Sequence, residues 1–166
     1  MKLSIDQLPS PLGDILVVTD CASLCALDYA DCRDRMISEL TSRFTTFQLV
    51  DVDDPLGVTS RLRAYFGGDL TALSDVPADA GGTPFQRMVW SQLRSIPTGG
   101  TITYGDLAAR IGRPGASRAV GHANSLNPIP IVLPCHRVIG ANATLTGYSG
   151  GLFRKEWLLR HEGAIV

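Results

Sequence analysis

The stretch DLTALSDVPADAGG, residues 69–82, divides the chain near its middle. It is rich in Asp, Pro and Gly and shows no hydrophobic periodicity, which is typical of a linker rather than of a helix or strand. A chain of 166 residues can bury a core either as one unit or as two small ones. The linker favours the second arrangement, so we predict one domain over residues 1–82 and another over residues 83–166.

The two halves differ in charge, although the whole chain has a net charge of only −1. Residues 1–82 carry 6 Lys and Arg against 13 Asp and Glu, a net −7, whereas residues 83–166 carry 9 against 3, a net +6. A basic domain attracts polyanions, so the second half is the candidate nucleic-acid-binding half. The N-terminus lacks the apolar run of a signal peptide, and no segment is long enough to span a membrane. We therefore expect a cytoplasmic protein with no membrane partner.

The first half alternates between the signals of strands and those of amphipathic helices. Short runs rich in Val, Leu, Ile and aromatic residues indicate strands, and apolar residues spaced three or four apart indicate helices. The predicted strands are residues 14–20, 23–30 and 45–52, and the predicted helices are residues 33–44 and 58–68. Together they predict a small α/β domain built on an antiparallel sheet.

The second half begins with clear helix-start signals. Thr83 is a good N-cap and Gln86 completes a capping box, while Thr103 stands at the same point before a second helix, residues 104–112. A tight turn with Gly and Pro separates this helix from a third, residues 117–126. Two short helices joined in this way form a helix-turn-helix pattern, and its position in the basic half supports a role in DNA binding.

The chain after Asn127 changes character. Three prolines in PIPIVLPC exclude a helix over residues 128–135, so we predict an extended segment there, followed by a turn-rich loop over residues 140–151. The last element is an amphipathic helix over residues 152–163. Its expected core residues are Leu152, Trp157 and Leu158.

Cys135 and His136 stand side by side directly after this proline-rich run. A cysteine is nucleophilic only as a thiolate, so a neighbouring base or positive charge must lower its pKa. Adjacent residues on a strand point to opposite faces, which makes direct proton transfer awkward and favours a water between the two side chains. A carboxylate would have to orient the histidine, and this half offers only three acidic residues: Asp106, Glu156 and Glu162. On the motif alone, a reactive thiol and an inert buried cysteine remain equally open.

The other cysteines give no sign of a metal site. Cys21, Cys25 and Cys32 form no CxxC pair, and the first histidine is His122. We therefore expect all three to be packing residues and predict no metal and no cofactor.

The motif PCHRVIG, in its context, resembles the O6-alkylguanine-DNA alkyltransferases. The flanking segments that carry the resemblance are TPFQRMVWSQLRSIP, YGDLAARIGRPGASRAVG, NPIPIVLP and LTGYSGGLFRKEWLLRHEG. The similarity covers the second half almost continuously, and the first half more loosely through SPLG and LRAYFGG. It is similar to the short, single-function bacterial type, and it implies a ribonuclease-H-like first domain and a winged-helix-like second domain.

The resemblance also implies an activity. Such a protein flips O6-alkylguanine out of duplex DNA and transfers the alkyl group to its own cysteine, once and irreversibly, which restores guanine. A thioether has no easy hydrolytic route back, which agrees with a single turnover. We expect a monomer whose partner is double-stranded DNA; the sequence leaves open the preferred alkyl group, activity on O4-alkylthymine and cooperativity on DNA.

Roles for single residues follow from the same resemblance. It places the alkyl acceptor at Cys135, the histidine that deprotonates it through a water at His136, and the carboxylate that orients this histidine at Glu162. Asn127 would brace the turn beneath the site, and Tyr104 would contact the target phosphate and donate a proton to guanine. Arg118 would replace the flipped base in the duplex. The residues implied to line the guanine pocket are Val138, Tyr148 and Ser149.

Three other readings of the second half differ in what they require. A sensor of alkylated bases would lack the acceptor cysteine, which is present here as Cys135. A cysteine hydrolase would need an oxyanion site and a direct contact between Cys135 and His136. A regulatory DNA-binding protein would prefer a particular sequence, whereas we expect weak, salt-sensitive and largely sequence-independent binding.

Overall fold

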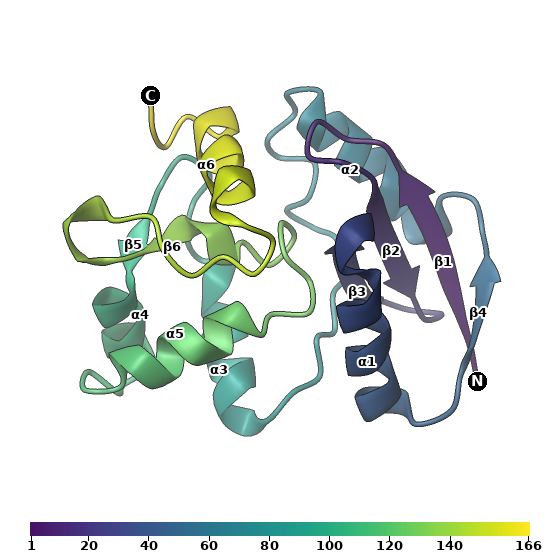
Figure 1. The fold of residues 1–166 in the computed structure, drawn as a ribbon, viewed down its shortest axis with the longest axis horizontal. Coiled ribbons are helices and arrows are strands. Elements are labelled where there is room, and N and C mark those ends of the chain that lie inside the picture. The colour runs from purple at the N-terminus through teal and green to yellow at the C-terminus, as the bar shows by residue number, and fades with distance from the viewer. The chain divides into compact units, whose positions relative to one another are not determined.

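The structure, a computed structural model, describes all residues from 1 to 166 and divides them into two compact units, Met1–Gly81 and Gly82–Val166. The division falls at the glycine-rich end of the stretch over residues 69–82. Both units are seen in Figure 1, where the colour follows the chain. None of the helices combines the length and the hydropathy that a bilayer-spanning segment requires.

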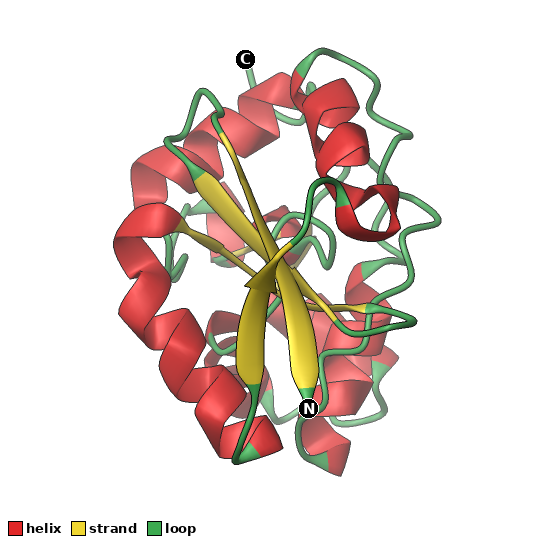
Figure 2. Ribbon diagram, turned by 90° about the vertical axis from the view of Figure 1, so that its right-hand side faces the viewer, coloured by secondary structure: helices red, strands yellow, loops and turns green.

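The N-terminal unit is built on a four-stranded sheet, whose twist is visible in Figure 2. Its strands are β1 (Lys2–Leu8), β2 (Ile15–Thr19), β3 (Leu24–Tyr29) and β4 (Gln48–Asp51), in the order β3-β2-β1-β4. The predicted small sheet with helices is confirmed, with one difference: β1 and β4 pair in parallel, so the sheet is mixed rather than antiparallel. Strand β1 was not predicted, although it lies between β2 and β4 and joins the two parts of the sheet.

Two helices cover opposite faces of this sheet. Helix α1 (Arg33–Phe44) packs on the face that carries Leu3 and Ile5, where buried apolar residues of the sheet meet Met36 and Leu40. Helix α2 (Val58–Phe66) reaches the other face, since the hydroxyl of Thr59 donates to Asp6, which alternates with Ile5 along β1. Short 3₁₀ helices, η1 (Ala30–Cys32) and η2 (Pro55–Gly57), precede α1 and α2.

The C-terminal unit is mostly helical. It contains α3 (Pro84–Leu93), α4 (Tyr104–Arg110), α5 (Ser117–Ser125) and α6 (Leu152–His161), with 3₁₀ helices η3 (Cys135–Arg137) and η4 (Ala141–Ala143). Two short strands, β5 (Ile102–Thr103) and β6 (Val138–Ile139), pair in parallel. Both predicted capping boxes are present, at Thr83 and at Thr103, and the helix-turn-helix pair corresponds to α4 and α5.

Trp90 of α3 anchors α5, the second helix of the helix-turn-helix pair. Its indole Nε1 donates to the carbonyl of Ala123 in α5 at 2.9 Å, and the ring is almost fully buried. Gly82 permits this arrangement, because its φ is +87° and a Cβ at this position would lie 2.4 Å from the Trp90 ring. Helix α5 is thereby anchored on the core of the unit near its C-terminal end.

Two predictions for the second half are wrong in detail. Residues 128–135 form a series of tight turns rather than an extended segment, since Leu133 N donates back to the carbonyl of Ile129 and Ile131 has a φ of +73°. Leu152 is half exposed, not part of the core, because it lies at the first position of α6; Trp157 is partly buried and Leu158 fully buried.

Candidate functional site

The turn that precedes Cys135 is held by one side chain. Asn127 donates from Nδ2 to the carbonyl of Leu133 at 2.8 Å, and its Oδ1 accepts from the backbone N–H of Ile129 at 3.0 Å. An amide that offers both a donor and an acceptor can replace two backbone partners that a helix or strand would supply. Cys135 follows directly, opens η3 and is only 6 % exposed.

His136, Arg137 and Glu162 form a buried charged cluster behind the thiol. His136 Nε2 lies 3.0 Å from Glu162 Oε2, and Arg137 donates to both carboxylate oxygens, from Nε at 2.8 Å and from Nη2 at 3.0 Å. The guanidinium is fixed further by the carbonyl of Ile96 at 2.7 Å. Of the three acidic residues that the sequence offered, the structure places Glu162 at the histidine.

The pKa values in this cluster follow from burial and from the shared carboxylate. Burial alone would raise the pKa of Glu162, but the hydrogen bonds from His136 and Arg137 and their charges outweigh it and hold that pKa well below its usual range. Burial lowers the pKa of His136 and prevails over the raising effect of Glu162. At neutral pH the cluster therefore holds an ionised Glu162 and a neutral imidazole with its Nε2 hydrogen directed at the carboxylate.

Lys155 of α6 is a second buried cation of the site. It is fully buried, and its Nζ donates to the carbonyls of Val138 and Thr146, each at 2.6 Å. Burial lowers the pKa of Lys155 to about 8, while the charge of a Cys135 thiolate acts in the opposite direction. A lysine ammonium near the thiol favours its ionised form.

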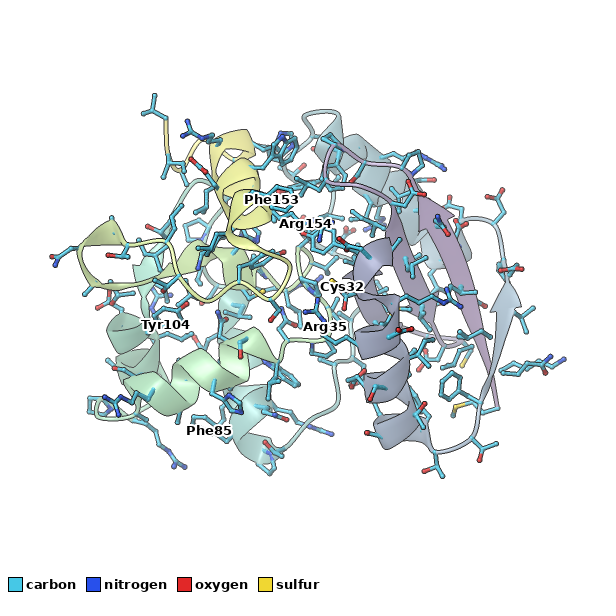
Figure 3. The ribbon with its side chains drawn as sticks, viewed as in Figure 1. Cys32, Arg35, Phe85, Tyr104, Phe153 and Arg154 are labelled. Atoms are coloured by element: carbon cyan, nitrogen blue, oxygen red, sulfur yellow. The ribbon has the colours of Figure 1, made fainter.

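Tyr104 lies at the start of α4, where Figure 3 labels it. Its hydroxyl donates to the carbonyl of Thr146 at 3.1 Å, and its ring centre lies 5.9 Å from Lys155 Nζ. Burial raises the pKa of Tyr104, the bond to Thr146 opposes this, and the charge of Cys135 adds to it. Gly147 allows the loop to pass so close, since it has a φ of +70° and a Cβ there would lie 2.9 Å from the tyrosine oxygen.

The remaining predicted residues lie on α5, on β6 and in the loop before α6. Arg118 is exposed near the N-terminus of α5, and no hydrogen bond or ion pair joins it to the cluster behind Cys135. Val138 is fully buried in β6 and faces Lys155 with its carbonyl. Tyr148 is buried in the loop before α6, and the hydroxyl of the exposed Ser149 donates to the carbonyl of Ser125, which ties this loop to the end of α5.

Three residues of the site escaped the sequence analysis: Asn124, Arg137 and Lys155. Two of them left a signal in the sequence. Arg137 follows His136 directly, and Lys155 falls in register with Leu158, Leu159 and Glu162 on the buried face of α6. A charged residue inside an apolar stripe indicates a buried charge with nearby partners. Asn124 left none, because its place on α5 is that of an ordinary polar residue.

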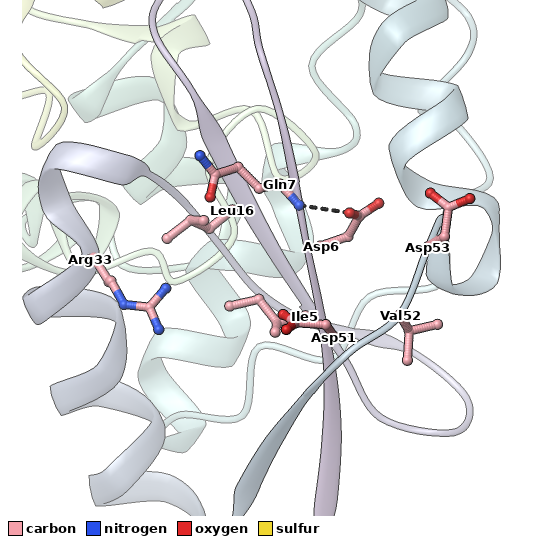
Figure 4. Close-up of a pocket in the computed structure, with 8 residues that line it drawn as sticks. All are labelled: Ile5, Asp6, Gln7, Leu16, Arg33, Asp51, Val52 and Asp53. Atoms are coloured by element: carbon pink, nitrogen blue, oxygen red, sulfur yellow. Dashed lines mark hydrogen bonds between the residues drawn. The ribbon is translucent and has the colours of Figure 1, made fainter.

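Outside this site the structure offers little reactive chemistry. The prediction that the three early cysteines are packing residues holds for Cys25, which is buried with a pKa raised by burial to about 11, but is wrong for Cys21, which is exposed; Cys32 is partly exposed. A pocket in the N-terminal unit is lined by three carboxylates, Asp6, Asp51 and Asp53, together with Arg33 (Figure 4). No group of three or more His, Cys, Asp or Glu residues in the chain could hold a metal ion.

A helix-turn-helix unit in which a buried cysteine directly precedes a histidine bonded to a buried carboxylate defines a class of proteins that combine DNA binding with a nucleophilic thiol. The chain belongs to one family of this class, the 6-O-methylguanine DNA methyltransferases. Residues 84–164 match the model of that family's DNA binding domain, and residues 6–80 match its ribonuclease-like domain. The resemblance seen in the sequence is confirmed, and so is the two-domain fold that it implied.

Known relatives resemble the chain over its whole length. It is 48 % identical to the methylated-DNA–protein-cysteine methyltransferase of Salmonella typhimurium, over 100 % of this chain and 99 % of that protein. The protein of the same name from Mycobacterium bovis is 44 % identical over 93 % of this chain and 89 % of the relative. Among solved structures, Mycobacterium tuberculosis OGT in complex with DNA superposes with a TM-score of 0.82 and 40 % identity, covering 99 % of this chain and 94 % of that one.

Proposed function

We propose that this protein repairs duplex DNA by transferring the alkyl group of O6-alkylguanine to the sulfur of Cys135. The observation that carries the proposal is the thiol at the start of η3, backed by the chain of contacts from His136 to Glu162 and Arg137. This site lies in the unit that matches a DNA-binding domain, and the relatives named above are methyltransferases of this kind.

The first step activates the thiol. His136 is neutral and fully buried. Its Nε2 is bonded to Glu162, so its Nδ1 is the ring nitrogen that can accept a proton. The thiol proton passes to this nitrogen through a water, and Glu162 balances the imidazolium that results. The ammonium of Lys155 and the guanidinium of Arg137 stabilise the thiolate. Asn127 fixes the turn that positions Cys135.

The second step transfers the group and releases guanine. The thiolate attacks the alkyl carbon, so a sulfur–carbon bond forms as the bond from that carbon to O6 of guanine breaks. The leaving base carries the electron pair and takes a proton from the hydroxyl of Tyr104, whose raised pKa keeps it protonated at neutral pH. The thioether at Cys135 has no route back, so each molecule acts once and needs no cofactor.

The base must leave the duplex before it can reach a buried thiol. Arg118 is exposed on α5, and a planar guanidinium is suited to stack in the place of a base that has been flipped out. We propose that Val138, Tyr148 and Ser149 line the pocket that receives the flipped guanine. We propose that the protein acts as a monomer on double-stranded DNA.

Intact-protein mass spectrometry tests this function. The protein is incubated with duplex DNA that contains a single O6-methylguanine, and the product is digested for peptide mapping. One added methyl on the Cys135 peptide, saturating at one per protein, is the expected result, and Cys135→Ala is the control that gains no mass. Tight binding without added mass would instead indicate a sensor, and repeated turnover of an ester substrate would indicate a hydrolase.

A further inference from the structure

Two buried side-chain atoms of the C-terminal unit have no hydrogen-bond partner, and both belong to residues next to the acceptor. They are Asn124 Oδ1 and His136 Nδ1. Asn124 lies on α5 and is 2 % exposed; its Nδ2 donates to the carbonyl of Cys135 at 3.3 Å. His136 is the next residue of the chain and is 0 % exposed. Buried polar atoms are nearly always satisfied, by protein or by ordered water, so this pair requires a common explanation.

The two atoms cannot satisfy each other. The amide oxygen of Asn124 is an acceptor only, and the contact of its Nδ2 with a carbonyl fixes the orientation of the amide. In His136 the hydrogen lies on Nε2, which faces the ionised Glu162 at 3.0 Å, so Nδ1 is also an acceptor. One of these buried acceptors belongs to a residue bonded to the backbone of Cys135 and the other to the residue that follows Cys135. A small donor with two hydrogens, which describes a water molecule, would satisfy both.

We infer that Asn124 is a positioning residue that holds the relay water against the thiol of Cys135. The water donates one hydrogen to Asn124 Oδ1 and the other to His136 Nδ1. Its lone pairs are thereby left to accept the thiol hydrogen. When the thiol ionises, its proton moves to the water while the hydrogen at Nδ1 moves onto the ring. The sulfur keeps the electron pair, the water is regenerated, and the imidazolium faces Glu162.

This inference rests on the proposed alkyl transfer and adds the group that orients its first step. The titratable and charged groups around the thiol are Tyr104 from α4, His136 and Arg137 from η3, Lys155 from α6 and Glu162 at the end of α6. None of them is changed by a substitution at Asn124. A shift in the titration of the thiol in such a variant therefore reports the orientation of the water rather than a lost charge.

The test is the pH dependence of Cys135 alkylation by iodoacetamide, a neutral reagent that needs no DNA. In Asn124→Leu, which keeps the volume and removes the acceptor, the apparent thiol pKa should rise by about one unit, so that the rate at pH 7 falls about tenfold. At high pH the rate should return to that of the wild type, because hydroxide then forms the thiolate without the relay. His122→Ala, an exposed change on the same helix, should leave the profile unchanged.

Two results would overturn the inference: an unchanged profile, or a loss of rate by the same factor at every pH, as a structural defect would cause. If the Leu variant does not fold, a high-resolution crystal structure of the wild-type protein decides. A water within about 3 Å of both Asn124 Oδ1 and His136 Nδ1 is expected there; a thiol bonded directly to Asn124 Oδ1 would exclude it. Because iodoacetamide replaces the DNA substrate, this outcome is independent of whether Cys135 accepts a methyl group from O6-methylguanine.

Discussion

Glu162 serves two neighbours at once, since its carboxylate accepts from both His136 and Arg137. Glu162→Gln keeps the shape of the side chain and removes the charge that balances the imidazolium. We expect the apparent pKa of the Cys135 thiol to rise and the rate of alkylation by duplex O6-methylguanine at pH 7 to fall about tenfold or more. The measurement is the rate of methyl transfer between pH 6 and 10. A profile identical to that of the wild type would remove Glu162 from the mechanism.

Glu162 also makes the free energy of unfolding of the C-terminal unit depend on pH. Because the folded state holds the pKa of Glu162 below its ordinary value of 4.5, its contribution is fully present above that pH and is lost as the pH falls. The free energy of unfolding should decrease by an amount on the order of 2 kcal/mol between pH 6 and pH 3 from this group alone. Denaturant unfolding followed by tryptophan fluorescence measures it, since Trp90 and Trp157, the two tryptophans, both lie in this unit. A Glu162→Gln variant with the same acid dependence would contradict the assignment.

At the scale of residues, the sequence indicated which side chains could react, but not how the buried charges around them are paired. The pairing of Cys135 with His136 was visible in the motif, whereas the choice of Glu162 among three acidic residues came from the family resemblance. Arg137 and Lys155 left a signal in the sequence, but their partners, such as the carbonyls of Ile96 and Val138, are brought together only by the fold and offset the cost of burying the two charges.

Helix α5 carries both the residue for which we propose DNA recognition and a residue that contacts Cys135. Arg118 is exposed near its beginning, and Asn124 contacts Cys135 near its end. Arg118→Ala should therefore keep the reactivity of Cys135 with the free base O6-benzylguanine while losing about 1.4 kcal/mol or more, which is tenfold or more in rate, on duplex DNA. Parallel single-turnover assays on the two substrates check this. Equal loss on both would show that Arg118 does not replace the flipped base.

The accuracy of the element predictions followed the strength of the local signal. The capping boxes at Thr83 and Thr103 fixed two helix starts, because the cap and its partner are only three residues apart. Strand β1 was missed, since its alternation of buried and partly exposed residues includes Ser4 and Asp6 and resembles a polar segment. The turns over residues 128–135 depend on Asn127 and on a positive φ at Ile131, and propensities describe neither.

For the molecule as a whole, the linker over residues 69–82 indicated the two-unit fold, and the uneven charge indicated which half would meet nucleic acid. Not all nine basic residues of the second half can meet a polyanion, however, since Arg137, Arg154 and Lys155 are buried and Arg160 pairs with Glu156. Composition gives the number of basic residues but not which of them are exposed. Besides Arg160, five arginines of the C-terminal unit are exposed: Arg87, Arg94, Arg110, Arg113 and Arg118.

These exposed arginines set the expected salt dependence of DNA binding. Each phosphate that a protein cation neutralises lowers the slope of log K against log salt by about 0.9, so a slope between about −2.7 and −4.5 is expected if three to five of these arginines engage the backbone. Arg113→Gln should make the slope less negative by about 1 and weaken binding alike on all sequences. Arg63→Gln, an exposed change on α2 of the acidic N-terminal unit, is the matched control and should leave the slope unchanged.

Fluorescence anisotropy on an unmodified duplex at several salt concentrations measures both variants. Equal effects of the two changes would mean that net charge alone attracts the protein to DNA, and strong preference for one sequence would mean that base contacts, not the phosphates, hold it there.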